Sequence, residues 1–143
     1  MIVTGGTGYL GIVEVGDLCA RMRARNLDLF EQLGAWVVDT SDPASQRLFA
    51  EAAHRHAWHA ELWAQRAPAI PAVDLDMSTA RPPAVPGPAA ERIPLYTVAL
   101  DELIDDLRTV GARVDVLLDP STVRTIDLVM VDLLDLQSRL SSC

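Results

Sequence analysis

Apolar residues recur every three or four positions in four stretches of the chain, which is the spacing of one face of an α-helix. The pattern predicts helices over about residues 14–38, 43–66, 95–118 and 122–140. The first connection, Ser41-Asp42-Pro43, is short, and its aspartate and proline suit the start of a helix. The last connection, Asp119-Pro120-Ser121, is equally tight. We therefore expect two antiparallel helical hairpins.

The middle connection, residues 67–94, is long and rich in proline, which excludes regular helix over most of it. Its prolines are Pro68, Pro71, Pro82, Pro83, Pro86, Pro88 and Pro94. An extended segment of this length spans the second helix, about 36 Å, with ease. The sequence thus predicts one all-α domain over residues 1–143, a four-helix bundle of two antiparallel hairpins joined by a long Pro-rich crossover. The alternative is a disordered linker with the hairpins paired in another way.

Two hairpins joined by one long crossover is the arrangement of ferritin-like bundles. Residues 30–37, FEQLGAWV, followed by residues 54–63, HRHAWHAELW, also resemble a set of small, mostly uncharacterised bacterial ferritin-like proteins. The resemblance covers the first two helices, and the last two match only in their apolar pattern. It implies a fold without implying an activity.

The N-terminal run Val3-Thr4-Gly5-Gly6-Thr7-Gly8-Tyr9-Leu10-Gly11 resembles the phosphate-binding turn of extended short-chain dehydrogenases. That turn binds a dinucleotide only within a parallel sheet of βαβ units, whereas the rest of this chain predicts helices. We therefore interpret residues 1–12 as an N-terminal arm and expect no nucleotide cofactor.

Charge and composition exclude several classes of partner. Lys and Arg total 12 against 20 Asp and Glu, a net charge of -8, which repels nucleic acids and anionic membranes. The sequence shows neither a membrane span nor a signal peptide, so we expect a cytoplasmic protein. The two cysteines, Cys19 and Cys143, do not form a disulfide framework.

Ferritin-like oxidases hold two irons with inward Glu residues and Glu-x-x-His strings. The second helix contains such a string, Glu51-Ala52-Ala53-His54, but at about 100° per residue it lies opposite the apolar stripe of that helix. On the last two helices no acid falls on the predicted buried face, and Asp132 and Asp135 are assigned outward. The standard carboxylate set is therefore not expected.

Other polar residues do fall on the predicted buried faces. His56 and His59 lie on or beside the stripe of the second helix, while Asn26 is central and Arg23 marginal on the first. A turn near residue 41 places Asn26 level with His56, and Arg23 level with His59. Tyr96 and Gln137 are candidates to join them from the second hairpin. The predicted pocket comprises Arg23, Asn26, His56, His59 and Tyr96, and the alternative is a set of hydrogen-bonded core groups that serve packing alone.

Two functions remain open, and the residues do not decide whether the protein is an enzyme. The first is a binding or scaffold module with no cofactor. The second is a divergent metal-dependent oxidase or oxygenase with iron or another divalent metal on His56 and His59, completed by an acid such as Asp127. We also expect a homodimer formed through outward apolar residues of the second and fourth helices. These residues are Trp58, Leu62, Leu128 and Val131.

Overall fold

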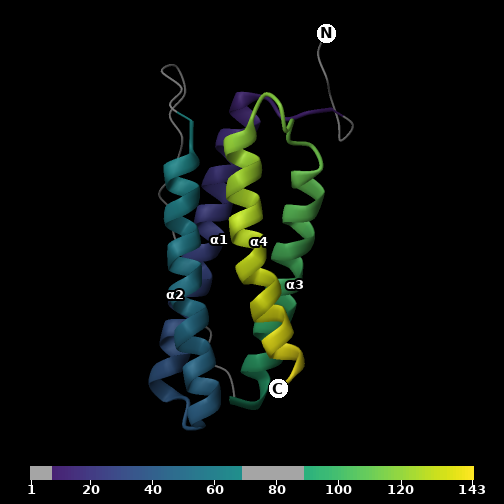
Figure 1. The fold of residues 1–143 in the computed structure, drawn as a ribbon. Helices are drawn as coiled ribbons and strands as arrows, with labels where there is room; N and C mark the ends of the chain where they lie inside the picture. The colour runs from purple at the N-terminus through teal and green to yellow at the C-terminus, as the bar shows by residue number, and fades with distance from the viewer. Residues whose placement is uncertain (1–7, 69–88) are drawn as a thin grey trace.

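The computed structural model describes residues 8–68 and 89–143 and is drawn in Figure 1. Over these ranges the chain forms four α-helices and no β-strand. The prediction of an all-α, four-helix protein is confirmed. Residues 1–7 of the expected arm and residues 69–88 of the expected crossover lie outside the described part. The helices are α1 (Ile12–Asp39), α2 (Pro43–Arg66), α3 (Ala89–Gly111) and α4 (Pro120–Ser141).

The starts of α2 and α4 are fixed locally and in the same way. Asp42 accepts a hydrogen bond from the backbone N–H of Ser45 at 3.0 Å, and Asp119 accepts one from the backbone N–H of Thr122 at 3.2 Å. A proline stands at the first turn of each helix, where its missing N–H would have no partner in the helix. Sequence-local chemistry therefore sets both hairpin turns.

The third helix differs from its predicted range at both ends. The sequence pattern predicts Pro94 in the linker, and this prediction is wrong, because Pro94 lies inside α3. It forgoes one backbone hydrogen bond near the start of the helix, where its own side chain is exposed. The helix then ends at Gly111, a poor helix former. Leu118, the last residue of the predicted range, is consequently 85% exposed in the loop before α4.

Contacts between helices fix their directions. Trp36 packs on Phe49 across the first hairpin, with ring centroids 5.4 Å apart. Near the end of α2, Arg66 pairs with Asp119 in the α3–α4 loop at 2.7 Å. Arg92, near the start of α3, pairs instead with Asp39 at the end of α1. The end of α2 and the start of α3 therefore lie at opposite ends of the bundle, and these two helices run in the same direction (Figure 1).

The core is formed by the inner faces of all four helices. α1 and α2 pack along their length and α2 approaches α4 closely, whereas α1 and α3 lie further apart. Phe30 of α1 lies at the edge of this core and is 40% exposed. None of the helices in residues 8–68 and 89–143 is long and apolar enough to cross a membrane. The largest side chains buried almost completely are those of Trp63, Tyr96, Phe49, Leu18, Met22 and Leu33.

Candidate functional site

A chain of three buried polar side chains crosses the middle of the bundle. Nδ1 of His56 lies 2.8 Å from Oδ1 of Asn26, and Nε2 of His56 lies 2.7 Å from the hydroxyl of Tyr96. None of the three is more than 2% exposed. Because they come from α1, α2 and α3, the chain ties three helices together. The structure thus brings together Asn26 and His56, which the hairpin register placed level, and adds Tyr96.

The direction of each hydrogen bond follows from the amide of Asn26. Its Nδ2 donates to the carbonyl of Met22 at 2.8 Å, so its Oδ1 faces the imidazole as an acceptor. Nδ1–H of His56 therefore donates to Asn26, and Nε2 accepts from the hydroxyl of Tyr96. Burial lowers the pKa of His56 from 6.5 to about 3 and raises the pKa of Tyr96. The three hydrogen-bonded side chains are therefore neutral, and the ring of His56 keeps no lone pair free for a metal.

His59 lies one turn further along α2 and has a different partner. Its Nε2 lies 2.9 Å from Oδ2 of Asp132 on α4. Burial lowers the pKa of His59, and the neighbouring Asp132 opposes the shift. The ring is therefore neutral, with the proton on Nε2. Its Nδ1 is buried and makes no hydrogen bond within the described part of the chain.

Arg23, which the hairpin register places level with His59, is half-buried at the margin of α1, and His59 hydrogen-bonds to Asp132. One expectation about this part of the bundle is wrong. The apolar pattern of α4 assigns Asp132 outward, yet its side chain is only 25% exposed and turns toward α2. A small change in helix phase, set by how α2 and α4 meet, accounts for the difference. Gln137 also stays outside the cluster and donates to Asp101 at 2.8 Å.

The Glu51-x-x-His54 string does not face the core. His54 is exposed, and Glu51 pairs with Arg55 at 3.1 Å and with Arg139 of α4. Within residues 8–68 and 89–143 no group of three or more His, Cys, Asp or Glu side chains is arranged to hold a metal ion. Asp127, the acid considered for a metal on the histidines, is exposed.

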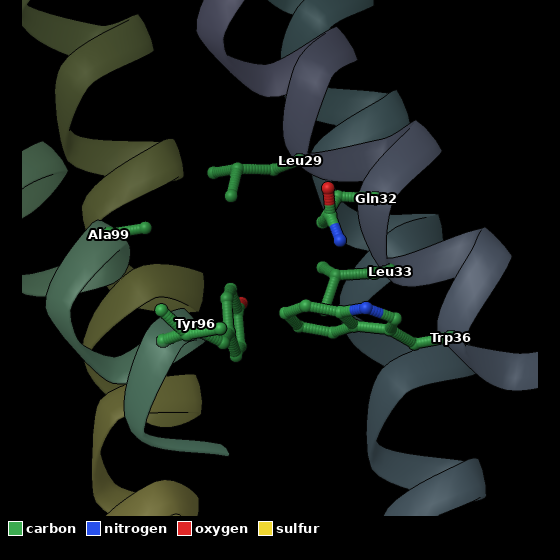
Figure 2. Close-up of a pocket in the computed structure, with 7 residues that line it drawn as sticks. Leu29, Gln32, Leu33, Trp36, Tyr96 and Ala99 are labelled. Atoms are coloured by element: carbon green, nitrogen blue, oxygen red, sulfur yellow. The ribbon is translucent and has the colours of Figure 1, made fainter. Parts of the chain in front are cut away.

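An open cavity adjoins the polar chain on the side of α1 and α3. Figure 2 shows it as a gap between the two helices, with the rings of Trp36 and Tyr96 at one end and Leu29 at the other. Its volume is about 200 Å³. Ala99 faces it from α3, where a larger residue would occupy the space. We call this cavity the α1–α3 slot, and its lining residues are Leu29, Gln32, Leu33, Trp36, Leu95, Tyr96 and Ala99.

Contacts outside the slot hold both of its aromatic side chains, Tyr96 and Trp36, in place. Tyr96 is fixed through its hydroxyl by His56. The indole of Trp36 packs against Phe49, and the guanidinium of Arg92 lies 5.8 Å from its ring centroid. Arg92 is itself fixed by two hydrogen bonds to Asp39, at 2.7 and 2.9 Å. The slot therefore keeps its aromatic walls in place without a ligand.

An ion pair between α1 and α3 lies on each side of the slot. Arg25 pairs with Asp106 on one side, and Arg92 pairs with Asp39 on the other. Sequence reasoning identified Tyr96 but missed the slot, because its existence depends on how far α1 and α3 stand apart. The small residue Ala99 on an otherwise bulky stripe was the available signal.

Comparison with known proteins gives no relative. No family model, no curated protein and no solved structure matches this chain.

Proposed function

We propose that this chain is a binding module of ferritin-like layout, and that it binds a small, mainly apolar molecule in the α1–α3 slot. The observation that carries the proposal is the slot itself, an apolar cavity of about 200 Å³ between two fixed aromatic rings. Ligand sites are typically concave, apolar and largely preformed, with few polar groups. Cavities of about 150 Å³ lined by apolar side chains hold a benzene ring. One aromatic ring with a short substituent, or a compact fused ring pair such as indole, is of the size that this slot holds.

The lining residues indicate the polarity of the ligand as well as its size. Six of the seven lining residues present apolar or aromatic surface, and Gln32 supplies an amide at one wall. A lining of this kind selects a ligand that is mainly apolar. In this function Tyr96 contacts the ligand with its ring, whereas Asn26 and His56 lie behind it. Their role is to hold the Tyr96 ring against the cavity.

The ferritin-like layout is supported by the directions of the helices. α2 and α3 run in the same direction, and each is antiparallel to its own hairpin partner, as two hairpins joined by a long crossover require (Figure 1). Among the described residues, the fully buried polar side chains include His and Asn but no Asp or Glu, and Asp132 reaches His59 from the margin of α4. A binding function is compatible with this helix layout and does not need the metal chemistry that such bundles usually carry.

The alternative, a metal-dependent oxidase or oxygenase using His56 and His59, has one observation in its favour. Nδ1 of His59 is free of hydrogen bonds in the described part, while Asp132 holds the opposite nitrogen, as carboxylates hold histidines that bind metals. Elemental analysis of protein purified without a tag separates the two functions. Iron, manganese or zinc near one equivalent per chain, lost on changing His59 to alanine, would replace the binding module by a metalloprotein.

The binding proposal is tested with indole and p-cresol as probes, titrated by calorimetry and by ligand-observed NMR. We expect both to bind the wild-type protein. Ala99→Leu should weaken binding at least about tenfold, because the added side chain occupies the ring position. The matched control is Val98→Leu, which enlarges the exposed neighbouring residue outside the slot. Failure of both probes to bind, or equal binding by wild type and Ala99→Leu, would contradict the proposal.

A further inference from the structure

The outward surface of α4 carries apolar side chains that no described element covers. Leu128 is 42% and Val131 is 69% exposed. Beside them Pro120 and Val123 form a shallow groove of about 550 Å³ that continues into the α3–α4 loop. We call the surface formed by these four residues together with Arg124 and Asp127 the α4 patch. Contiguous exposed apolar surface of this kind marks a contact site more often than a random surface does.

Two charged residues lie within the patch. Arg124 and Asp127 are both exposed and both line the groove, and neither pairs with another described residue. This differs from the arginines at the helix contacts, such as Arg55 and Arg92, which are bound by carboxylates. An unpaired cation and an unpaired anion three residues apart on one helix are self-complementary. A second copy of the same surface, turned around, supplies each with its opposite.

We propose that the α4 patch binds the α4 patch of a second copy of this chain, with the two α4 helices antiparallel across a two-fold axis. If the axis passes between Arg124 and Asp127, each Arg124 meets Asp127 of the other copy, and the ion pair forms twice. The same spacing places Leu128 against Val123, and Val131 against Pro120. Such an isologous contact closes on itself and makes a dimer.

The overall charge favours this surface over others. At a net charge of -8, most approaches of two copies are repulsive. The α4 patch contains one basic and one acidic residue and is locally neutral, so contact there avoids that repulsion and adds two attractive pairs. The patch shares no residue with the α1–α3 slot. Dimer formation and ligand binding are therefore separate properties with separate tests.

The experiment is a charge exchange measured by sedimentation velocity over a wide range of protein concentration. We expect the wild-type chain to be a dimer that dissociates on dilution. Arg124→Asp alone and Asp127→Arg alone should each weaken the dimer at least about tenfold, because each creates two like-charge contacts. The double variant Arg124→Asp/Asp127→Arg should recover most of the wild-type affinity. Circular dichroism checks that each variant keeps its helices, as expected for exposed positions.

Apolar contact is tested with a matched pair of variants. Val131→Glu should give a monomer, while Val98→Glu, at an exposed valine of α3 outside the patch, should leave the dimer intact. A wild-type monomer at every concentration overturns the proposal and leaves another occupant of the patch, such as residues 69–88 of the same chain. A dimer that survives both single charge changes and Val131→Glu also overturns it, because its interface lies elsewhere.

Discussion

Besides its two hairpins, the bundle has two antiparallel helix pairs that are built differently, α2 with α4 and α1 with α3. Between α2 and α4, polar contacts recur along the helices, from Arg139 with Glu51, through Arg55 with Asp135 and His59 with Asp132, to Arg66 with Asp119. Between α1 and α3, ion pairs occur at Glu14 with Arg113, Asp106 with Arg25, and Asp39 with Arg92. The slot lies between the last two.

The comparison shows that ion pairs alone do not make a closed contact. Both helix pairs have arginine–carboxylate bridges, yet α1 and α3 leave an apolar cavity between two of their bridges. The pocket lined by α2 and α4 lies where α2 begins and α4 ends, beside Glu51 and Arg139. The difference lies in the residues between the bridges. His59 fills the α2–α4 contact with a buried ring, whereas Ala99 leaves the α1–α3 contact open. The slot is therefore a local feature of a few side chains, and single substitutions can test it.

The largest effect is expected at His56, which joins the two sides of the bundle. His56→Ala removes a buried ring and leaves both Asn26 Oδ1 and the Tyr96 hydroxyl without their partner. We expect a loss of about 4 kcal/mol in the free energy of unfolding, from the cavity and the unpaired groups together. Urea denaturation measures it. His54→Ala, on the exposed face of the same helix, is the matched control and should change stability by less than about 0.5 kcal/mol.

How well the sequence predicts a contact between two helices depends on the length of the chain segment that joins them. The Asn26–His56 contact could be predicted, because a turn of few residues fixes the register of α1 against α2. The His59–Asp132 contact could not, because α2 and α4 are separated by the long connection and a whole helix. Whether Asp132 faces the core depends on how α2 and α4 pack against each other. The apolar periodicity of α4 alone does not contain that information.

The end of α3 shows a second limit. Val110, Val114 and Leu118 continue the apolar spacing of the helix, so the pattern extends past Gly111. The backbone nevertheless leaves the helix there, and Val114 is buried from the loop instead. Apolar spacing reports which residues favour burial, and it does not require that the backbone between them be helical. The slot could not be predicted for a similar reason, because it depends on the distance between two helices, which apolar spacing does not report.

The next effect tests the closed contact between α2 and α4. Asp132→Ala leaves Nε2–H of the buried His59 without an acceptor, and the desolvation cost of that donor is about 2 kcal/mol. The matched control is Asp135→Ala, at an exposed carboxylate that pairs with Arg55 on the same helix face. Its effect on urea denaturation should be much smaller. Equal losses for both variants would mean that the ion pairs, and not the buried histidine, stabilise this contact.

Stability should also depend on pH through the buried imidazoles. The pKa values of His56 and His59 are lowered by burial, that of His56 from 6.5 to about 3. Between these two values the unfolded chain binds protons that the folded chain does not, so stability falls as the pH falls. From about pH 6.5 to 5, above the range where most carboxylates titrate, His56 alone contributes a loss of about 1.5 kcal/mol. Denaturation midpoints in urea across this range measure it. A wild-type protein whose stability is constant from about pH 6.5 to 5 would contradict the burial of neutral imidazoles in the core.

The smallest effect has the opposite sign and decides whether the α1–α3 slot is open in solution. Ala99→Leu adds apolar carbons to a position that faces the cavity. If the slot is open, they fill existing space and the protein gains about 1 kcal/mol of stability. If α1 and α3 close on each other, the same carbons overpack the contact and cost about 1–3 kcal/mol. Val98→Leu, on the exposed side of α3, should neither stabilise nor destabilise the protein. The sign of the stability change for Ala99→Leu therefore shows whether the cavity is open.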